Sequence, residues 1–174
     1  MDKRIIVTVV GSTLGLINAS GFALAETVGR YDCSVVGAAS QDPIGDKDGH
    51  RLTTVQYSCF GLDGMAKGAV YSGVSTSEWD GPKGTYLAGG GIIRAPQGLA
   101  ITEIAEGVGS AVMKDGKPAG NEASGKARIK FASGTLAELS GKAVRWEAKP
   151  AGFMRFSLEV VTDTEAVTIG KSQQ

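Results

Sequence analysis

The only histidine in the chain, His50, closes a short polar stretch that also contains Asp46 and Asp48. Two carboxylates and an imidazole nitrogen are groups that can share a cation. The stretch lacks the repeated acidic positions and the distant glutamate of a calcium-binding loop, however. We therefore predict a solvated hairpin tip here, with no metal and no other cofactor.

Other catalytic signatures are incomplete. No serine lies in a G-x-S-x-G turn, and a single histidine argues against a serine triad. Val112 stands where a dinucleotide fingerprint beginning at Gly107 needs its third glycine. The glutamates are spread along the chain, and the sequence does not set the separation across a cleft that glycoside hydrolysis requires. This pattern favours a non-catalytic protein and leaves an enzyme as the alternative.

Aromatic residues with polar tips are the best candidates for a binding site. An inward ring in a strand can line a cavity and supply one hydrogen bond to a ligand. The competing interpretation is that the rings fill the interior. A buried carboxylate with a perturbed pKa would add acid or base chemistry, and Glu103 is the first place to look for one. The candidate residues are Tyr57, Tyr71, Trp79, Tyr86, Glu103 and Trp146.

The two cysteines, Cys33 and Cys59, lie in segments with strand character. Turn residues fill the run 41–49 between them. Opposed residues in an antiparallel hairpin have a constant sum of numbers, so a pairing of Cys33 with Cys59 centres the connection on Asp46, inside this run. We predict a structural cross-strand disulfide. A redox pair is the weaker alternative, because there is no C-x-x-C motif.

The first 25 residues have the features of a secretory signal. Lys3 and Arg4 precede an apolar stretch from Ile5 to Ile17, and residues 23–25 form an A-x-A cleavage site. The apolar stretch is too short to span a bilayer, which needs about 20 residues. We expect an exported protein, periplasmic or secreted, with no membrane span after cleavage. Residues 26–174 then form a single domain.

Composition restricts the partners and the fold. The 18 basic and 18 acidic side chains leave no net charge, which argues against nucleic-acid binding. The 26 glycines among 174 residues are about twice the usual share of ~7%. Together with the prolines they divide residues 26–174 into pieces that are mostly too short for self-supporting helices. An all-β chain is the expected result.

Hydrophobic alternation and turn residues divide the chain into strands. Turns are expected at 80–82 and 114–117, and at 162–165 before a short last strand. The expected strands cover 30–36, 52–60, 67–79, 85–94, 108–114, 126–133, 144–148 and 154–160.

Two connections, 95–99 and 149–153, carry Pro and Gly at the positions of a three-residue hairpin loop. In the second, this loop sets Trp146 opposite Phe156, so that the apolar faces of the two strands coincide. The flanking pairs are then Val144 with Leu158 and Ala148 with Met154. In the first, the expected pairs are Ile93 with Ile101 and Gly91 with Glu103.

A meander of eight to ten short strands must protect its edges, and closure into a barrel does so most completely. We therefore predict an all-β antiparallel meander closed into a barrel of about eight strands, with one short helical turn at 135–139. A flattened two-sheet sandwich is the alternative. Ile92 and Ile93 point to opposite faces, so one of them lies outside and hints at a homo-oligomer contact.

Residues 125–142, GKARIKFASGTLAELSGK, run from a strand through Gly-Thr and a short turn to Leu-x-Gly and the next strand. In this glycine spacing the chain resembles small calycin-like barrels of the allene oxide cyclase and dirigent type. The resemblance covers roughly 40 residues. It implies an eight-stranded barrel with a cavity, often trimeric, and no catalytic or binding residue of the family is carried over by it.

These observations lead to one function and two alternatives. The leading hypothesis is an exported, non-catalytic barrel that binds a small apolar or amphipathic molecule in its interior. The second is a cofactor-free cyclase or isomerase in which a buried Glu or Tyr positions the substrate. The third is a structural envelope protein without a pocket.

Overall fold

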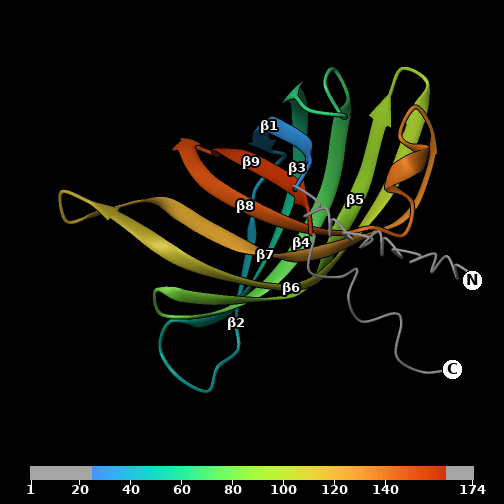
Figure 1. The fold of residues 1–174 in the computed structure, drawn as a ribbon. Coiled ribbons are helices and arrows are strands. Elements are labelled where there is room, and N and C mark those ends of the chain that lie inside the picture. Colours follow the sequence, from blue (N-terminus) through green and yellow to red (C-terminus); the bar gives the residue numbers. More distant parts are fainter. Residues whose placement is uncertain (1–24, 164–174) are drawn as a thin grey trace, which may run out of the picture.

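The computed structural model describes residues 25–163, and in this part of the chain it is almost entirely β-structure (Figure 1). The signal segment expected over 1–25 lies outside the described residues except for its last alanine. The short strand expected near the end of the chain also lies outside them. The elements are β1 (Thr27–Val35), β2 (Ser40–Pro43), β3 (His50–Asp63), β4 (Val70–Asp80), β5 (Lys83–Ala95), β6 (Gly98–Lys114), β7 (Lys117–Gly134), the 3-10 turn η1 (Ala137–Leu139), β8 (Ala143–Gly152) and β9 (Arg155–Thr162).

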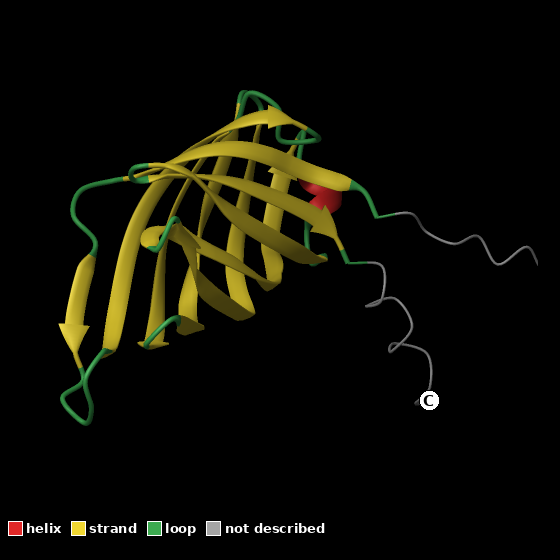
Figure 2. Ribbon diagram, turned by 90° about the vertical axis from the view of Figure 1, so that its left-hand side faces the viewer, coloured by secondary structure: helices red, strands yellow, loops and turns green. Residues whose placement is uncertain are grey.

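Eight of these strands form a closed antiparallel barrel (Figure 2). Strands β3 to β9 pair in sequence order, and β1 joins the two ends of this series because it pairs with both β3 and β9. Strand β2 stands outside the closed ring and pairs with β3. The predicted barrel is therefore confirmed, and so is the helical turn, which forms as η1.

The predicted disulfide is present, and it joins directly opposed residues of β1 and β3. Cys33 pairs with Cys59, and the adjacent pairs keep the same sum of residue numbers. Both cysteines are buried on the inner face of the barrel. The link between the two strands is more elaborate than a single hairpin: β2 continues the pairing along β3, and the turn-rich run joins β2 to β3.

The register predicted for the hairpin of β8 and β9 is wrong. Trp146 pairs with Val160, and Phe156 pairs with Pro150. Strand β8 continues through the Pro-x-Gly segment, with a bulge there, and the turn lies further on, where Met154 adopts a positive φ of 54°. The slip is four residues, an even number, so the apolar faces still coincide. The flanking pairs change in the same way, to Val144 with Thr162 and Ala148 with Leu158.

The register predicted for the hairpin of β5 and β6 is also wrong, by one residue. Ile93 pairs with Ala100, and Gly91 pairs with Thr102. The connection is a two-residue turn at 96–97, since Ala95 already pairs with Gly98. After a shift of one residue, a side chain and the residue predicted to oppose it lie on opposite faces of the sheet. Glu103 is the residue for which this matters most.

The two ends of the barrel differ. At the end where β1 begins and β9 ends, η1 and the turn between β3 and β4 cover the interior, and Figure 2 shows the helical turn at this end. Leu136, Leu139 and Val28 are fully buried there. The other end carries the turns between β4 and β5, β6 and β7, and β8 and β9, and we call it the mouth. The hairpin of β6 and β7 extends well past the rest of the mouth (Figure 1).

Apolar side chains also lie on the outer wall. Ile93 is 2% exposed and faces inward, whereas Ile92 pairs with the exposed Ile101, which in turn pairs with the exposed Phe131. The expected split of Ile92 and Ile93 between the two faces is confirmed, and the homo-oligomer stays a prediction. No helix within residues 25–163 is long and apolar enough to cross a membrane.

Loss of the disulfide should weaken the fold without changing it. Reduction of the Cys33–Cys59 bond, across a sequence separation of 26, is expected to lower the free energy of unfolding by about 3.5 kcal/mol, because the unfolded chain gains freedom. Urea unfolding with and without dithiothreitol measures this change. The C33S/C59S double variant is the control, since its stability should equal that of the reduced protein and should not respond to the reductant. Equal stability of the oxidised and reduced protein would contradict the prediction.

Candidate ligand-binding cavity

The barrel interior is hollow between the plugged end and the mouth. The cavity has a volume of about 290 Å³ and is lined by residues from every strand of the ring. This volume is close to the lower limit of ~300–1,000 Å³ for small-molecule sites. The five predicted aromatic residues all line it: Tyr57, Tyr71, Trp79, Tyr86 and Trp146.

Glu103 does not belong to this site. It pairs with Gly90 instead of Gly91 and faces the outside of the barrel. Its carboxylate Oε2 lies 3.3 Å from Nζ of Lys130, and its side chain is 54% exposed. The prediction of an inward carboxylate failed because the turn between β5 and β6 is one residue shorter than the Pro-x-Gly pattern suggested.

The inward tyrosine rings are placed by glycines on neighbouring strands. Tyr57 pairs directly with Gly73, and a Cβ atom at Gly73 would lie 2.6 Å from the Tyr57 ring. A Cβ at Gly91 would lie 2.8 Å from the ring of Tyr71. Because glycine has no side chain, each ring can lie against the backbone of the next strand instead of standing upright in the barrel.

The rings of the two tryptophans also lie against glycines, and each ring covers a glycine on each of two neighbouring strands. Trp146 extends over Gly125 of β7 and Gly107 of β6, where an added Cβ would lie 2.9 and 2.6 Å from its ring. Its ring meets Tyr86 edge to face at a centroid distance of 5.1 Å. Trp79 extends in the opposite direction, over the paired glycines Gly84 and Gly109. Both indoles therefore lie along the wall and leave the centre of the barrel open.

A hydrogen-bonded chain of hydroxyl groups crosses the inner wall from β3 to β6. The Tyr57 and Tyr71 hydroxyl oxygens are 3.1 Å apart, and the Tyr71 oxygen lies 2.9 Å from Oγ1 of Thr102. The backbone N–H of Gly91 donates to Thr102 Oγ1 at 3.0 Å. Burial, and to a smaller extent the neighbouring Tyr71, raises the pKa of Tyr57 above its usual range. The phenol therefore stays protonated and neutral.

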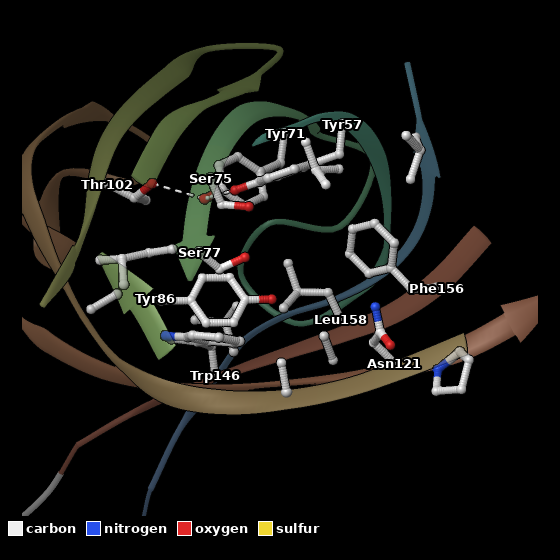
Figure 3. A pocket seen from close by; sticks show the side chains of 18 of the residues that line it. Tyr57, Tyr71, Ser75, Ser77, Tyr86, Thr102, Asn121, Trp146, Phe156 and Leu158 are labelled. Carbon is white, nitrogen blue, oxygen red and sulfur yellow. Dashed lines mark hydrogen bonds between the residues drawn. The ribbon is translucent and has the colours of Figure 1, made fainter. Parts of the chain in front are cut away.

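A second group of hydroxyls lies along β4 and β5, and Figure 3 shows it facing the hollow. Ser77 Oγ accepts a hydrogen bond from Trp79 Nε1 at 2.9 Å and keeps its own hydrogen free to donate. The hydroxyls of Ser75 and Tyr86 have no hydrogen-bond partner within residues 25–163. Burial raises the pKa of Tyr86, so this phenol is neutral as well.

The serines and Thr102 were missed by the sequence analysis. The signal was present, because alternation along β4 puts Tyr71, Gly73, Ser75, Ser77 and Trp79 on one face. Serine is small and common on protein surfaces, so its presence on an inward face becomes evident only when the neighbouring strands are in place. The opposite wall, from β8 and β9, is apolar and includes Ala148, Phe156, Leu158 and Val160.

Charged groups are scarce around the cavity. Among residues 25–163, no Asp, Glu, His, Lys or Cys lines it. Arg155 is the one charged residue that the described part of the chain contributes to the lining. It stands at the mouth, and its guanidinium donates to the Asp32 carboxylate. In the described part of the chain, the cavity therefore has hydroxyl groups, the Asn121 amide and an apolar wall, but no acid–base pair.

His50 lies at the mouth, and its side chain is less exposed than a residue at the predicted solvated hairpin tip would be. Its ring is 12% exposed, with Nδ1 2.6 Å from Asp46 and Nε2 2.7 Å from Glu78. Lys47 Nζ lies 2.7 Å from Asp80 and ties the same loop to the end of β4. The described part of the chain contains no group of three or more His, Cys, Asp or Glu side chains arranged to hold a metal ion. The cluster is an ionic link between the loop and the barrel.

No protein-family model, curated protein or solved structure matches this chain. The resemblance to calycin-like barrels of the allene oxide cyclase and dirigent type therefore stays a prediction.

The fit of Trp146 over Gly107 can be tested by a double-mutant cycle. The atoms nearest to a methyl group at Gly107 would belong to the rings of Trp146, at 2.6 Å, and Tyr86, at 3.2 Å, so G107A should destabilise the barrel by about 1–3 kcal/mol through overpacking. In a W146L background the same change should cost less than about 0.5 kcal/mol, since the obstructing ring is gone. Urea unfolding of the four proteins gives the coupling, and an equal cost of G107A in both backgrounds would refute the contact.

The environment of His50 gives a pH prediction. Hydrogen bonds with Asp46 first and Glu78 second raise the pKa of His50 above 6.5. The stabilisation is therefore fully present below pH 6.5 and disappears as the pH rises through the raised pKa. A titration followed by NMR measures this value directly, because His50 is the only histidine in the chain. The E78Q variant should lower the pKa of His50, and a wild-type value at or below 6.5 would be incompatible with the two bonds.

Proposed function

We propose that this protein binds a small apolar or amphipathic molecule inside the barrel. The hollow interior is the observation that supports the proposal. Inward rings lie along the walls, one end is plugged by fully buried Leu136 and Leu139, and about 290 Å³ stays open toward the mouth. Interiors of proteins are normally filled to the density of organic crystals. A largely apolar hollow near the lower size limit of small-molecule sites supports the binding of a small ligand.

The proposal includes export to the periplasm or the exterior of the cell. A buried disulfide between directly opposed residues is typical of oxidising compartments. The basic start, apolar stretch and A-x-A motif in residues 1–25 support the same destination.

The two alternative functions have less support. A structural envelope protein without a pocket would have a filled interior, and this barrel is hollow. In a cyclase or isomerase a buried Glu or Tyr would position the substrate. Glu103 lies on the outer wall, which leaves only the inward tyrosines of the described residues for that role. Binding is therefore the function that the described residues support best.

A filled cavity should abolish binding. Ala148 lines the cavity on β8, so A148F should fill the space and weaken binding of the uncharged fluorescent probe N-phenyl-1-naphthylamine by about tenfold or more. Fluorescence titration measures the affinity. The matched control is A88F, since Ala88 is exposed on β5 and should leave binding unchanged. Native mass spectrometry of the protein from its own host should also show a bound molecule. The proposal fails if the wild-type protein shows neither saturable probe binding nor a copurified molecule.

A further inference from the structure

The two walls of the cavity differ in chemistry. On one wall, the hydroxyl groups of Ser75, Ser77 and Tyr86 face the hollow. Ser77 and Tyr86 are directly paired across β4 and β5, and Ser75 lies two positions earlier on the inner face of β4. Figure 3 shows Leu158 and Phe156 across the hollow from them, with the Asn121 amide beside this apolar pair.

The polar wall has unused hydrogen-bonding capacity. Ser75 is 8% exposed and Ser77 is 5% exposed, yet the Ser75 hydroxyl has no partner among the described residues. Ser77 accepts the indole N–H of Trp79, and its hydrogen is free. The Tyr86 hydroxyl is also without a partner in residues 25–163. Among the described residues, the fully buried polar atoms without a partner are Tyr31 Oη, Arg51 Nε and Trp146 Nε1. The hydroxyls of the polar wall are not among them, because they line the hollow, where a ligand can reach them.

These groups are spread along the wall instead of being gathered at one end. Residues two positions apart on a strand are separated by about 7 Å, so Ser75 and Ser77 offer hydrogen bonds at two depths in the cavity. A linear apolar chain with a single polar head would satisfy only one of them. A ring system with two polar groups on one edge satisfies both, and its other edge faces Leu158 and Phe156.

The cavity also selects against charge. A buried ion needs a partner of opposite sign. Of the residues that the structure describes, only Arg155 brings a charge to the lining, and it is already bonded to Asp32. We infer that the ligand is an uncharged ring molecule with hydrogen-bonding groups along one edge and an apolar opposite edge. The inference rests on the proposed binding function and specifies the class of ligand.

Isomeric naphthalenediols test this inference. In 2,7-dihydroxynaphthalene both hydroxyls lie on the same long edge, whereas in the 2,6 isomer they lie on opposite edges. Isothermal titration calorimetry with the intact protein should show that the 2,7 isomer binds about tenfold more tightly than the 2,6 isomer and than naphthalene. The anion 2-naphthoate should bind more weakly than the 2,7 isomer.

Two serines on the same strand provide a variant and its control. S75A breaks no hydrogen bond within the described residues and should weaken binding of the 2,7 isomer about fivefold, with naphthalene unchanged. S77A is the second variant and should act in the same direction. S72A is the matched control, because Ser72 occupies the outer face of β4, where it pairs with Ile92, and it should leave all affinities as they are.

The possible failures are distinguishable. If no naphthalene derivative and no N-phenyl-1-naphthylamine binds the wild-type protein, the proposed function is overturned and this inference with it. If the probes bind but the two isomers have equal affinity, or 2-naphthoate binds most tightly, the inference alone is overturned. The same conclusion follows if S72A weakens binding as much as S75A.

Discussion

The contact between inward aromatic rings and glycines on neighbouring strands is the constraint on which this barrel depends. Each indole lies flat over two glycines, Trp146 over Gly125 and Gly107, and Trp79 over Gly84 and Gly109. A side chain at Gly84, Gly107 or Gly109 would meet an indole first, and one at Gly125 would also meet the backbone of β6. These glycines therefore have a structural role, because they let the two indoles lie along the wall and leave the centre of the barrel open.

The disulfide and the closure of the barrel act on the same part of the wall. Cys33 pairs with Cys59 on one side and with Phe156 on the other, so the bond holds the strand that joins the first and last members of the meander. Tyr71 pairs with Cys59 on the next strand, and its hydroxyl continues into the chain of bonds with Tyr57 and Thr102. Covalent and polar contacts thus stiffen the wall next to the cavity.

The two ends of the barrel differ, so the cavity opens at one end only. Fully buried leucines around η1 plug one end, whereas the mouth is bordered by turns and by the loop that His50 ties to Glu78. A ligand would enter from the mouth and meet the hydroxyls of β4 and the apolar side chains of β9 on the way in. Specificity would then come from the contrast between these two walls.

The sequence by itself determined the class of fold, the disulfide and the inward position of the aromatic residues, whereas the structure decided that their rings line a hollow instead of filling it. Alternation, turn residues and the numbering of the two cysteines are local properties of the chain, and they were sufficient for these conclusions. Only the tertiary structure decided the registers, the outward position of Glu103 and the inward row of Ser75 and Ser77. Register depends on where a turn begins and whether a strand bulges, and packing against the next strand decides both. A slip of one residue reverses the face of every side chain. The two Pro-x-Gly segments are alike in sequence, but their turns form at different positions, so the pattern does not predict which polar groups face the cavity.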